Sequence, residues 1–263
     1  MDAGAATHVS QEDAQPSGGA LRVAREMIYS PLEYENLTER ATRRIAEAIG
    51  LGLLEVGERL PSEAELAGLF GIAPMTARES LNALRRTGYL ETRRGRSGGT
   101  FITKAIPQPE PGLDAGNLAG VELEELRDLT ELRVAVSGAA TALAAERARD
   151  DELDELAGLV ETMGAEAHYP SFRRLDTRFH VSIASASRSK RLTLLETTIQ
   201  SELQALFPMV PHRDEGLGIT NGQHRAIVST LRQRDPDDAR RVMEEHARAS
   251  GEYLVLLWMS ARR

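Results

Sequence analysis

Three histidines and one aspartate in the C-terminal half of the chain have the residue types and spacing of a metal site. Asp176 and His180 are one helical turn apart in a segment whose apolar residues recur at helical spacing, so both side chains face an apolar stripe. His224 and His246 lie on similar stripes of two later segments. Burying an unpaired carboxylate or imidazole is costly, and one shared metal ion would satisfy all four side chains. We therefore predict that Asp176, His180, His224 and His246 bind a metal.

Each of these residues also has a simpler explanation. A single core histidine is usually hydrogen-bonded to a neighbour, and Asp176 with His180 could be an ordinary pair one turn apart. The metal hypothesis therefore depends on all four residues together, since three of the chain's six histidines share one helical region. The apolar residues of the three stripes are Phe172, Phe179 and Ile183, then Ile227, Val228 and Leu231, and finally Ala239, Val242 and Tyr253.

The region that would position these side chains is predicted to be an all-helical bundle. Its apolar residues recur at helical spacing, and Asp150 and three prolines mark breaks between segments. Helices that project polar side chains inward are a common way to build a metal site in a bundle core. The predicted helices span about residues 121–149, 151–166, 170–187, 189–207, 216–234 and 236–259, and the first could be two helices.

The segment before this bundle has the pattern of a helix-turn-helix. A first amphipathic helix is predicted over residues 37–49. Ser62 and Glu65 form a capping-box pattern at the start of a second, short helix. Gly71 breaks the chain, and a third helix that begins near Pro74 follows. Two short helices joined by a glycine turn are typical of this DNA-binding motif.

A β-hairpin is predicted to follow the third helix as a wing. The apolar period changes to two over residues 89–93 and 100–103, with glycines between them. The chain is acidic, with 32 basic and 40 acidic residues, yet the stretch 85–96 holds five arginines against Glu91 alone. Such a run is often only a solvated surface. At the end of a recognition helix and along a wing, it favours contact with DNA phosphates.

The N-terminal motifs resemble a known family. The segment LPSEAELAGLFGIAPMTARESLNALRRTGYLETRRGRSGGTFI is similar to the GntR family of bacterial transcription regulators, whose usual pattern runs LPSERELA, then GVSRxTVREAL, then RRGxGTFV. The resemblance implies that Thr76 and Arg78 face the major groove and that the wing around residues 96–99 lies at the minor groove or the backbone. The candidate DNA-binding residues are Ser62, Thr76, Arg78, Arg94, Arg96 and Gly98.

The chain departs from this family pattern at two expected arginine contacts. The arginine after Pro-Ser-Glu is Ala64 here, and the Ser-Arg opening of the recognition helix is Ala73-Pro74. Loss of a bidentate arginine contact to a base costs about 1–3 kcal/mol of discrimination. We therefore expect an operator that differs from the family's common sequence, or binding that depends more on Arg78 and the wing. A winged helix that binds protein instead of DNA is the alternative.

The C-terminal quartet carries a second resemblance. Asp176 and His180 in D-x-x-x-H, followed by His224 in QHRAI and His246 in EEHARA, are similar to the FCD effector domain of the FadR-type branch of GntR regulators, over residues of about 120–257. The resemblance implies a divalent ion, zinc in the first place and nickel or manganese as alternatives, whose shell is completed by water or by the carboxylate of a small organic-acid effector.

The same resemblance implies that Arg133 binds the effector's carboxylate, a role that suits a planar guanidinium. The glutamate usual four residues later is Ser137 here, which leaves the neighbouring contacts open. The alternative for Arg133 is a surface ion pair with Glu131 or Glu125.

Together these features predict a mainly α protein that acts as a ligand-switched homodimer. Two recognition helices would bind a palindromic double-stranded DNA operator, and the effector would change the affinity by population shift, with repression as the more common sign in the family. The alternatives are a metalloenzyme, disfavoured because no general base is evident and Glu245 projects to another helix face, and a purely structural metal with the effector bound elsewhere.

Composition and linker patterns complete the prediction. The chain has no cysteine, which fits a reducing compartment, and no stretch of about 18 apolar residues, so we expect a cytoplasmic protein without a membrane span. The predicted organisation is a flexible tail (1–30), a winged helix-turn-helix domain (31–104), a linker (105–119) and an FCD-type ligand-binding and dimerisation domain (120–260).

Overall fold

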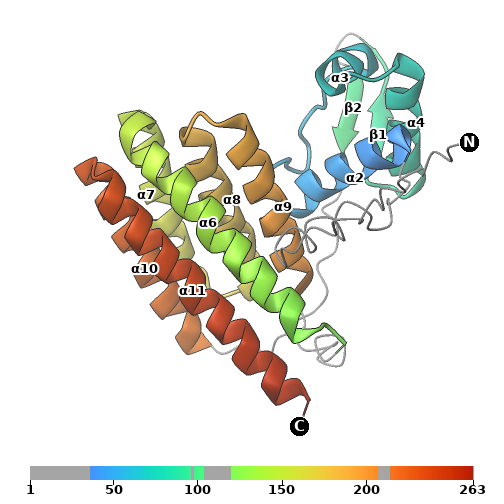
Figure 1. The fold of residues 1–263 in the computed structure, drawn as a ribbon. Coiled ribbons are helices and arrows are strands. Elements are labelled where there is room, and N and C mark those ends of the chain that lie inside the picture. The colour runs from blue at the N-terminus through green and yellow to red at the C-terminus, as the bar shows by residue number, and fades with distance from the viewer. Residues whose placement is uncertain (1–35, 96–97, 104–119, 207–213, 263) are drawn as a thin grey trace, which may run out of the picture. The chain divides into compact units, whose positions relative to one another are not determined.

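The computed structural model describes residues 36–95, 98–103, 120–206 and 214–262, and Figure 1 shows that these residues are mainly helical. The predicted tail at residues 1–30, the predicted linker at 105–119 and Arg96 lie outside the described residues. Within these described ranges, three helices and a hairpin are followed by an all-helical part, so the predicted fold class is confirmed.

The N-terminal part forms as its local sequence dictates. The Ser62 hydroxyl accepts a hydrogen bond from the Glu65 amide, and the Glu65 carboxylate accepts one from the Ser62 amide, which confirms the capping box. Gly71 ends the short helix in the left-handed conformation, with φ of 65°, where glycine has no steric penalty. The elements are α2 (Leu37–Gly50), α3 (Glu63–Phe70), α4 (Pro74–Arg86), β1 (Leu90–Arg93) and β2 (Gly99–Ile102).

The hairpin and the small N-terminal core differ from the prediction in two details. The segment before α3 pairs with β2, since the Gly57 amide donates to Ile102 and the Leu60 amide donates to Thr100. This pairing was not predicted because the segment is too short to show a period of two. Leu37, predicted on the apolar stripe of α2, is 52% exposed. The core of this part consists of Ile45, Ile49, Leu60, Leu66, Ala67, Ala77, Leu81, Leu84, Leu90 and Ile102.

The described residues of the C-terminal part form six helices, and every predicted boundary lies within two residues of the observed one. The first helix is continuous and is not divided in two. Within the described residues, none of the helices combines the length and the apolar character that a membrane span requires. The helices are α6 (Leu123–Arg147), α7 (Asp150–Ala165), α8 (Tyr169–Ala186), α9 (Lys190–Leu206), α10 (Asp214–Gln233) and α11 (Pro236–Ala261).

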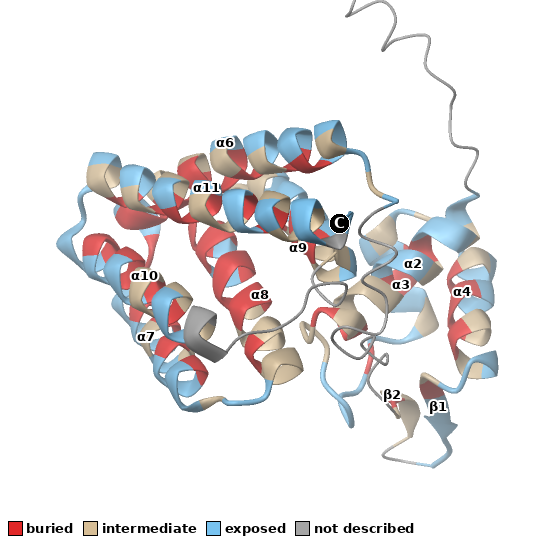
Figure 2. Ribbon diagram, turned by 90° about the horizontal axis from the view of Figure 1, so that it is seen from below, coloured by how far each residue is buried: buried red, intermediate tan, exposed pale blue. Residues whose placement is uncertain are grey.

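The bundle buries α8 among its neighbours and pairs its two longest helices. Helices α6 and α11 lie side by side in both views (Figures 1 and 2), and Figure 2 shows that α8 is largely buried. Phe172 and Phe179 of α8 lie in the main apolar core with Ile227 of α10 and Met243 of α11. The candidate ligands on these helices therefore face one common interior.

Gly251 in α11 permits the close contact between α11 and α6. A Cβ at this position would fall inside contact distance of the Thr130 methyl and hydroxyl groups. We expect Gly251→Ala to lower the free energy of unfolding by about 1–3 kcal/mol, because overpacking displaces neighbouring atoms. Gly158 in α7 is the matched control: its Cβ would meet nothing within 4 Å, so Gly158→Ala should add about 0.5–1 kcal/mol. Urea unfolding measures both, and a stabilised Gly251→Ala variant would contradict the contact.

Candidate metal centre and nucleic-acid interface

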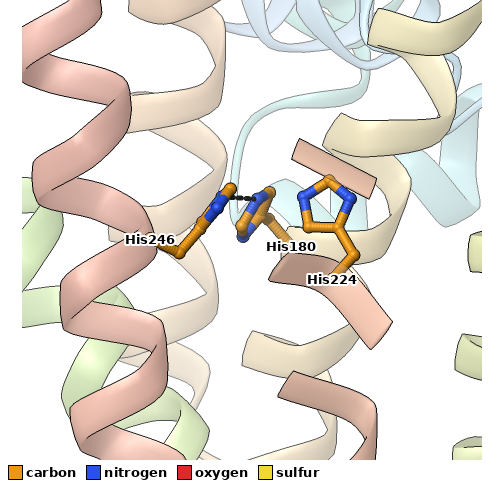
Figure 3. Close-up of side chains that lie close together, drawn as sticks. All are labelled: His180, His224 and His246. Carbon is orange, nitrogen blue, oxygen red and sulfur yellow. Dashed lines mark hydrogen bonds between the residues drawn. The ribbon is translucent and has the colours of Figure 1, made fainter. Parts of the chain in front are cut away.

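Three helices bring the three predicted histidines together in the core of the bundle. His180 comes from α8, His224 from α10 and His246 from α11, and Figure 3 shows their imidazoles turned toward one another. All three are at most 2% exposed. One nitrogen from each ring lies within 4.8 Å of the others, and the Nε2 atoms of His180 and His246 are 3.2 Å apart.

Asp176 lies beside this histidine cluster. Its Oδ1 lies 3.2 Å from His224 Nε2 and 3.9 Å from His180 Nε2, while Oδ2 accepts a 2.6 Å hydrogen bond from Arg173 Nη1. Burial alone would raise the pKa of Asp176, but the charge of Arg173 acts in the opposite direction, and the pKa lies well below its usual value. The carboxylate is therefore ionised and available as a ligand.

The hydrogen bonds around His246 direct its Nε2 lone pair toward the cluster. Gln223 Oε1 lies 2.9 Å from His246 Nδ1, and an amide oxygen accepts, so Nδ1 carries the proton. Such a partner fixes the tautomer and the ring orientation of a metal-binding histidine. Arg133 Nη2 lies 3.3 Å from Nε2 of both His246 and His180 and can donate to these lone pairs.

Burial keeps His180 and His246 in the neutral form that binds metals. It lowers the pKa of His180 well below its usual value although Asp176 acts in the opposite direction. Burial and then Arg133 lower the pKa of His246 in the same way. Both imidazoles are therefore neutral near pH 7, with lone pairs that a cation can accept.

The chemistry and spacing of the cluster fit a divalent ion. Among the described residues, neither ring nitrogen of His224 has a hydrogen-bond partner, although Asp176 lies at ion-pair distance. Two nitrogens bound to one tetrahedral zinc at about 2.0–2.1 Å are separated by roughly 3.3 Å, close to the 3.2 Å between His180 and His246. Unsatisfied buried nitrogens at ligand spacing are expected where an ion belongs.

Arg133 is buried in this site and is not on the surface. It is 3% exposed and contacts two of the histidines, so its alternative explanation as a surface ion pair with Glu131 or Glu125 is wrong. Burial lowers the pKa of its guanidinium, while Asp176 and Glu196 counteract that effect. Arg133 lies on α6, whereas the two histidines lie on α8 and α11. Sequence spacing alone therefore could not predict that its side chain contacts them.

Three further residues of the site were not predicted, and the prediction that Tyr253 lies on the apolar stripe of α11 was wrong. Arg173 precedes Asp176 by almost one helical turn, and Gln223 precedes His224, so both could have been noticed as near neighbours. Glu196 on α9 is 1% exposed and gave no sequence signal, because its helix carries none of the ligands. Tyr253 is 40% exposed and does not face the core.

The predicted DNA-contacting side of α4 is open to solvent in part. Arg78 is exposed, with a 4.0 Å ion pair from its Nε to Glu63, and Thr76 is half-buried. Arg94 at the end of β1 is exposed. The Ser62 hydroxyl is already used as the cap of α3, so it has less capacity for a DNA phosphate than predicted.

Two arginines of the predicted basic edge hold the domain together. Arg85 donates to Asn82 Oδ1 at 2.6 Å and to Thr100 Oγ1 at 3.0 Å, and it thereby links α4 to β2. Arg93 pairs with Glu91 and lies over the Phe101 ring, 4.3 Å from its centroid. The charge count along the sequence could not separate these structural arginines from those that are exposed.

Gly98 has a structural reason to be glycine. A Cβ there would lie 2.5 Å from the Arg93 carbonyl oxygen and 2.8 Å from that of Gly95. We expect Gly98→Ala to distort the wing and to weaken operator binding at least about tenfold, because backbone atoms cannot give way as a side chain can. Fluorescence anisotropy with operator DNA measures the change. Gly68→Ala, whose Cβ would meet nothing within 4 Å, is the control, and equal affinity of the two variants would refute the role of Gly98.

Comparison with known proteins identifies both parts of the chain. Residues 37–102 match the family described as bacterial regulatory proteins, gntR family, and residues 128–249 match the FCD domain. The HTH-type transcriptional regulator RmpR of Mycobacterium gastri is 36% identical over 238 residues, which cover 88% of this chain and 85% of RmpR. The chain belongs to the GntR family.

Other GntR-family proteins match over similar lengths. The HTH-type transcriptional repressor NanR of Citrobacter rodentium is 28% identical over 243 residues, covering 89% of this chain and 91% of NanR. A solved structure of Streptococcus agalactiae GntR aligns with 82% of this chain and 99% of its own, at 26% identity and a TM-score of 0.44. This GntR-family chain is thus a transcriptional regulator with an FCD domain, and not an enzyme.

Proposed function

We propose that this regulator binds a palindromic operator as a homodimer and that a small organic acid, bound at or beside a divalent metal in the FCD domain, switches its operator affinity. One observation carries the proposal: Arg133 lies against the same histidine nitrogens that would bind the metal. A cation and a guanidinium in one buried site call for an anion, and a carboxylate fits both partners.

The charges of the site support an anionic effector. The site holds two acidic side chains, Asp176 and Glu196, and two guanidinium groups, those of Arg133 and Arg173. Burial raises the pKa of Glu196 and so favours its neutral form. A divalent ion would add two positive charges to this buried group of side chains. Uncompensated charge in a buried site is costly, and an organic acid would remove part of it.

Asp176, His180, His224 and His246 are the residues that would hold the ion. A set of three nitrogens and one oxygen suits zinc best, with nickel or manganese as alternatives. An ion that accepts a further ligand beyond these four would supply a Lewis-acidic position for the effector's carboxylate. Gln223 would keep the His246 ring in its binding orientation, and Arg133 would bind the carboxylate's other oxygen.

The DNA-binding part of the proposal uses α4 and the wing. Thr76 and Arg78 would contact bases in the major groove, and Arg94, Arg96 and Gly98 would form the wing's contacts. Within this proposal, residues 31–104 form the DNA-binding domain and residues 120–260 form the effector and dimerisation domain. We also propose that the regulator is cytoplasmic and acts as a repressor, in keeping with the repressor NanR among its relatives.

Operator selection tests this function directly. Randomised double-stranded DNA is selected on the zinc-loaded protein, and the winning sequence is titrated with and without each of a panel of small organic acids. The proposal expects an inverted repeat and at least one acid that changes the Kd about tenfold, within the usual range of allosteric coupling. Selected sequences without symmetry would refute the dimeric mode, and an effect that persists after chelation would refute the metal-centred switch.

Burial of the four ligands favours one other candidate, a metal that only joins the helices of the bundle. The four side chains are at most 2% exposed, as expected of a closed structural site. In that case chelation would lower the melting temperature, and the effect of an organic acid on operator binding would not depend on the metal. The buried Arg133 argues for the sensor, because a structural site gains nothing from a guanidinium beside its ligands.

A further inference from the structure

A second polar cluster lies in the bundle beside the candidate metal centre. Glu196 of α9 accepts a 2.7 Å hydrogen bond from the Ser137 hydroxyl and a 2.9 Å hydrogen bond from Gln200 Nε2. All three side chains are at most 2% exposed. A buried carboxylate is rare unless it is paired, and this one has only neutral hydrogen-bond donors.

Helix α6 connects the two clusters. Arg133 and Ser137 are four residues apart on this helix, so their side chains lie on one face about one turn, or roughly 5.4 Å, from each other. Arg133 contacts His180 and His246, and Ser137 contacts Glu196. A molecule whose carboxylate reached Arg133 would therefore have the Glu196 cluster about one helical turn away.

The cluster retains hydrogen-bonding capacity. Over the part of the chain that the structure describes, Gln200 Oε1 and Arg133 Nε are buried without a hydrogen-bond partner. Each such group costs about 1–3 kcal/mol, which a purely structural network would avoid. Gln200 Nε2 donates to Glu196, and the unused acceptor Oε1 belongs to the same amide group.

We propose that Glu196 and Gln200 form a second recognition point of the effector site, selecting organic acids that carry a hydroxyl or ammonium group about one helical turn from the carboxylate. The inference rests on the proposed function, because Arg133 and the metal hold the carboxylate end. Ser137 limits how many hydrogen bonds Glu196 can accept from an effector, since the Ser137 hydroxyl already donates to one oxygen of Glu196. The second recognition point distinguishes acids that the metal and Arg133 alone would bind alike.

Three acids of equal chain length test the proposal: butyrate, γ-hydroxybutyrate and γ-aminobutyrate, which end in a methyl, a hydroxyl and an ammonium group. Calorimetric titration of the zinc-loaded full chain should give a Kd at least about tenfold lower for one or both donor-bearing acids than for butyrate. The preferred acid shows whether the donor is a hydroxyl or an ammonium group. Equal affinity for all three acids, or no binding of any, would overturn the proposal.

Variants show whether Glu196 is responsible. Glu196→Gln should reduce the preference for the donor-bearing acids to less than about threefold, whereas Glu202→Gln, an exposed change on the same helix, should leave the preference unchanged. Ser137→Ala keeps the carboxylate and removes its donor, so the preference should rise, which decides the matter if Glu196→Gln does not fold. An unchanged preference in Glu196→Gln, or a loss in Ser137→Ala, would overturn the proposal.

The same titrations separate this inference from the proposed function. If chelation and Arg133→Met leave binding intact while Glu196→Gln abolishes the preference, the metal-centred function fails and the second recognition point survives. If chelation abolishes binding while Glu196→Gln changes nothing, the function survives and the recognition point fails.

Discussion

His224→Ala is expected to weaken metal binding by at least about 100-fold, while operator binding by the N-terminal part is retained. Among the described residues, Nδ1 of His224 has no hydrogen-bond partner and Nε2 faces only Asp176 Oδ1 at 3.2 Å, so the ring has few polar roles besides that of a ligand. Loss of groups that only orient ligands already costs 10–100-fold in metal affinity, and loss of a ligand itself should cost more. Competition with a chelator of known affinity measures the change.

The control must separate ligand loss from general destabilisation. The His224 ring packs 4.8 Å from the Phe179 ring, centroid to centroid, so its removal also leaves a cavity. Ile227→Ala, one turn later on α10 and fully buried, creates a cavity without removing a ligand. It should lower stability by about 2–5 kcal/mol but leave the metal affinity unchanged. Full metal occupancy in His224→Ala would exclude His224 as a ligand.

Arg133→Met is expected to have the opposite effect on the metal and to abolish the response to organic acids. Arg133 Nη2 lies 3.3 Å from Nε2 of His180 and of His246, the two nitrogens that would bind the metal. The positive charge of the guanidinium therefore repels the cation. Two unit charges about 4 Å apart interact by several kcal/mol at protein-like screening. Metal affinity should therefore rise at least about tenfold, as measured by chelator competition, and no acid should change operator affinity.

Arg127→Met on the same helix is the matched control, because Arg127 is exposed and its removal should change neither property. If Arg133→Met instead loses metal as His224→Ala does, then Arg133 holds the histidines in place and does not compete with the ion. If the variant keeps its response to acids, the effector's carboxylate is bound elsewhere.

Local signals were sufficient to predict most of the fold. The start and end of α3 depend on residues that are close in sequence, namely Ser62 and Glu65 in the capping box and Gly71 at the C-terminal end. Their spacing therefore predicts this helix. The prolines and apolar periods of the C-terminal half place its helices in the same way. Where a long-range contact decides, prediction failed: the segment with Gly57 pairs with a strand over 40 residues later.

The histidine cluster could be predicted from the sequence because its residues are both polar and on apolar stripes. The stripe shows that His180, His224 and His246 face inward, and a shared interior then brings them together. Arg133, Glu196 and Gln223 were harder, since their roles depend on which side chains of other helices they meet. The same is true of Arg85 in the DNA-binding part. It was predicted as part of a basic surface, but it donates to Thr100 and so links α4 to β2.

The most direct test of the account is thermal unfolding of the full chain with a panel of small organic and sugar acids, as isolated, after chelation and after zinc is restored. We predict that at least one acid near 100 times its Kd raises the Tm by about 5 °C or more. This shift should vanish on chelation and return with zinc. No acid response together with a lower Tm after chelation would contradict the sensor and indicate a structural metal.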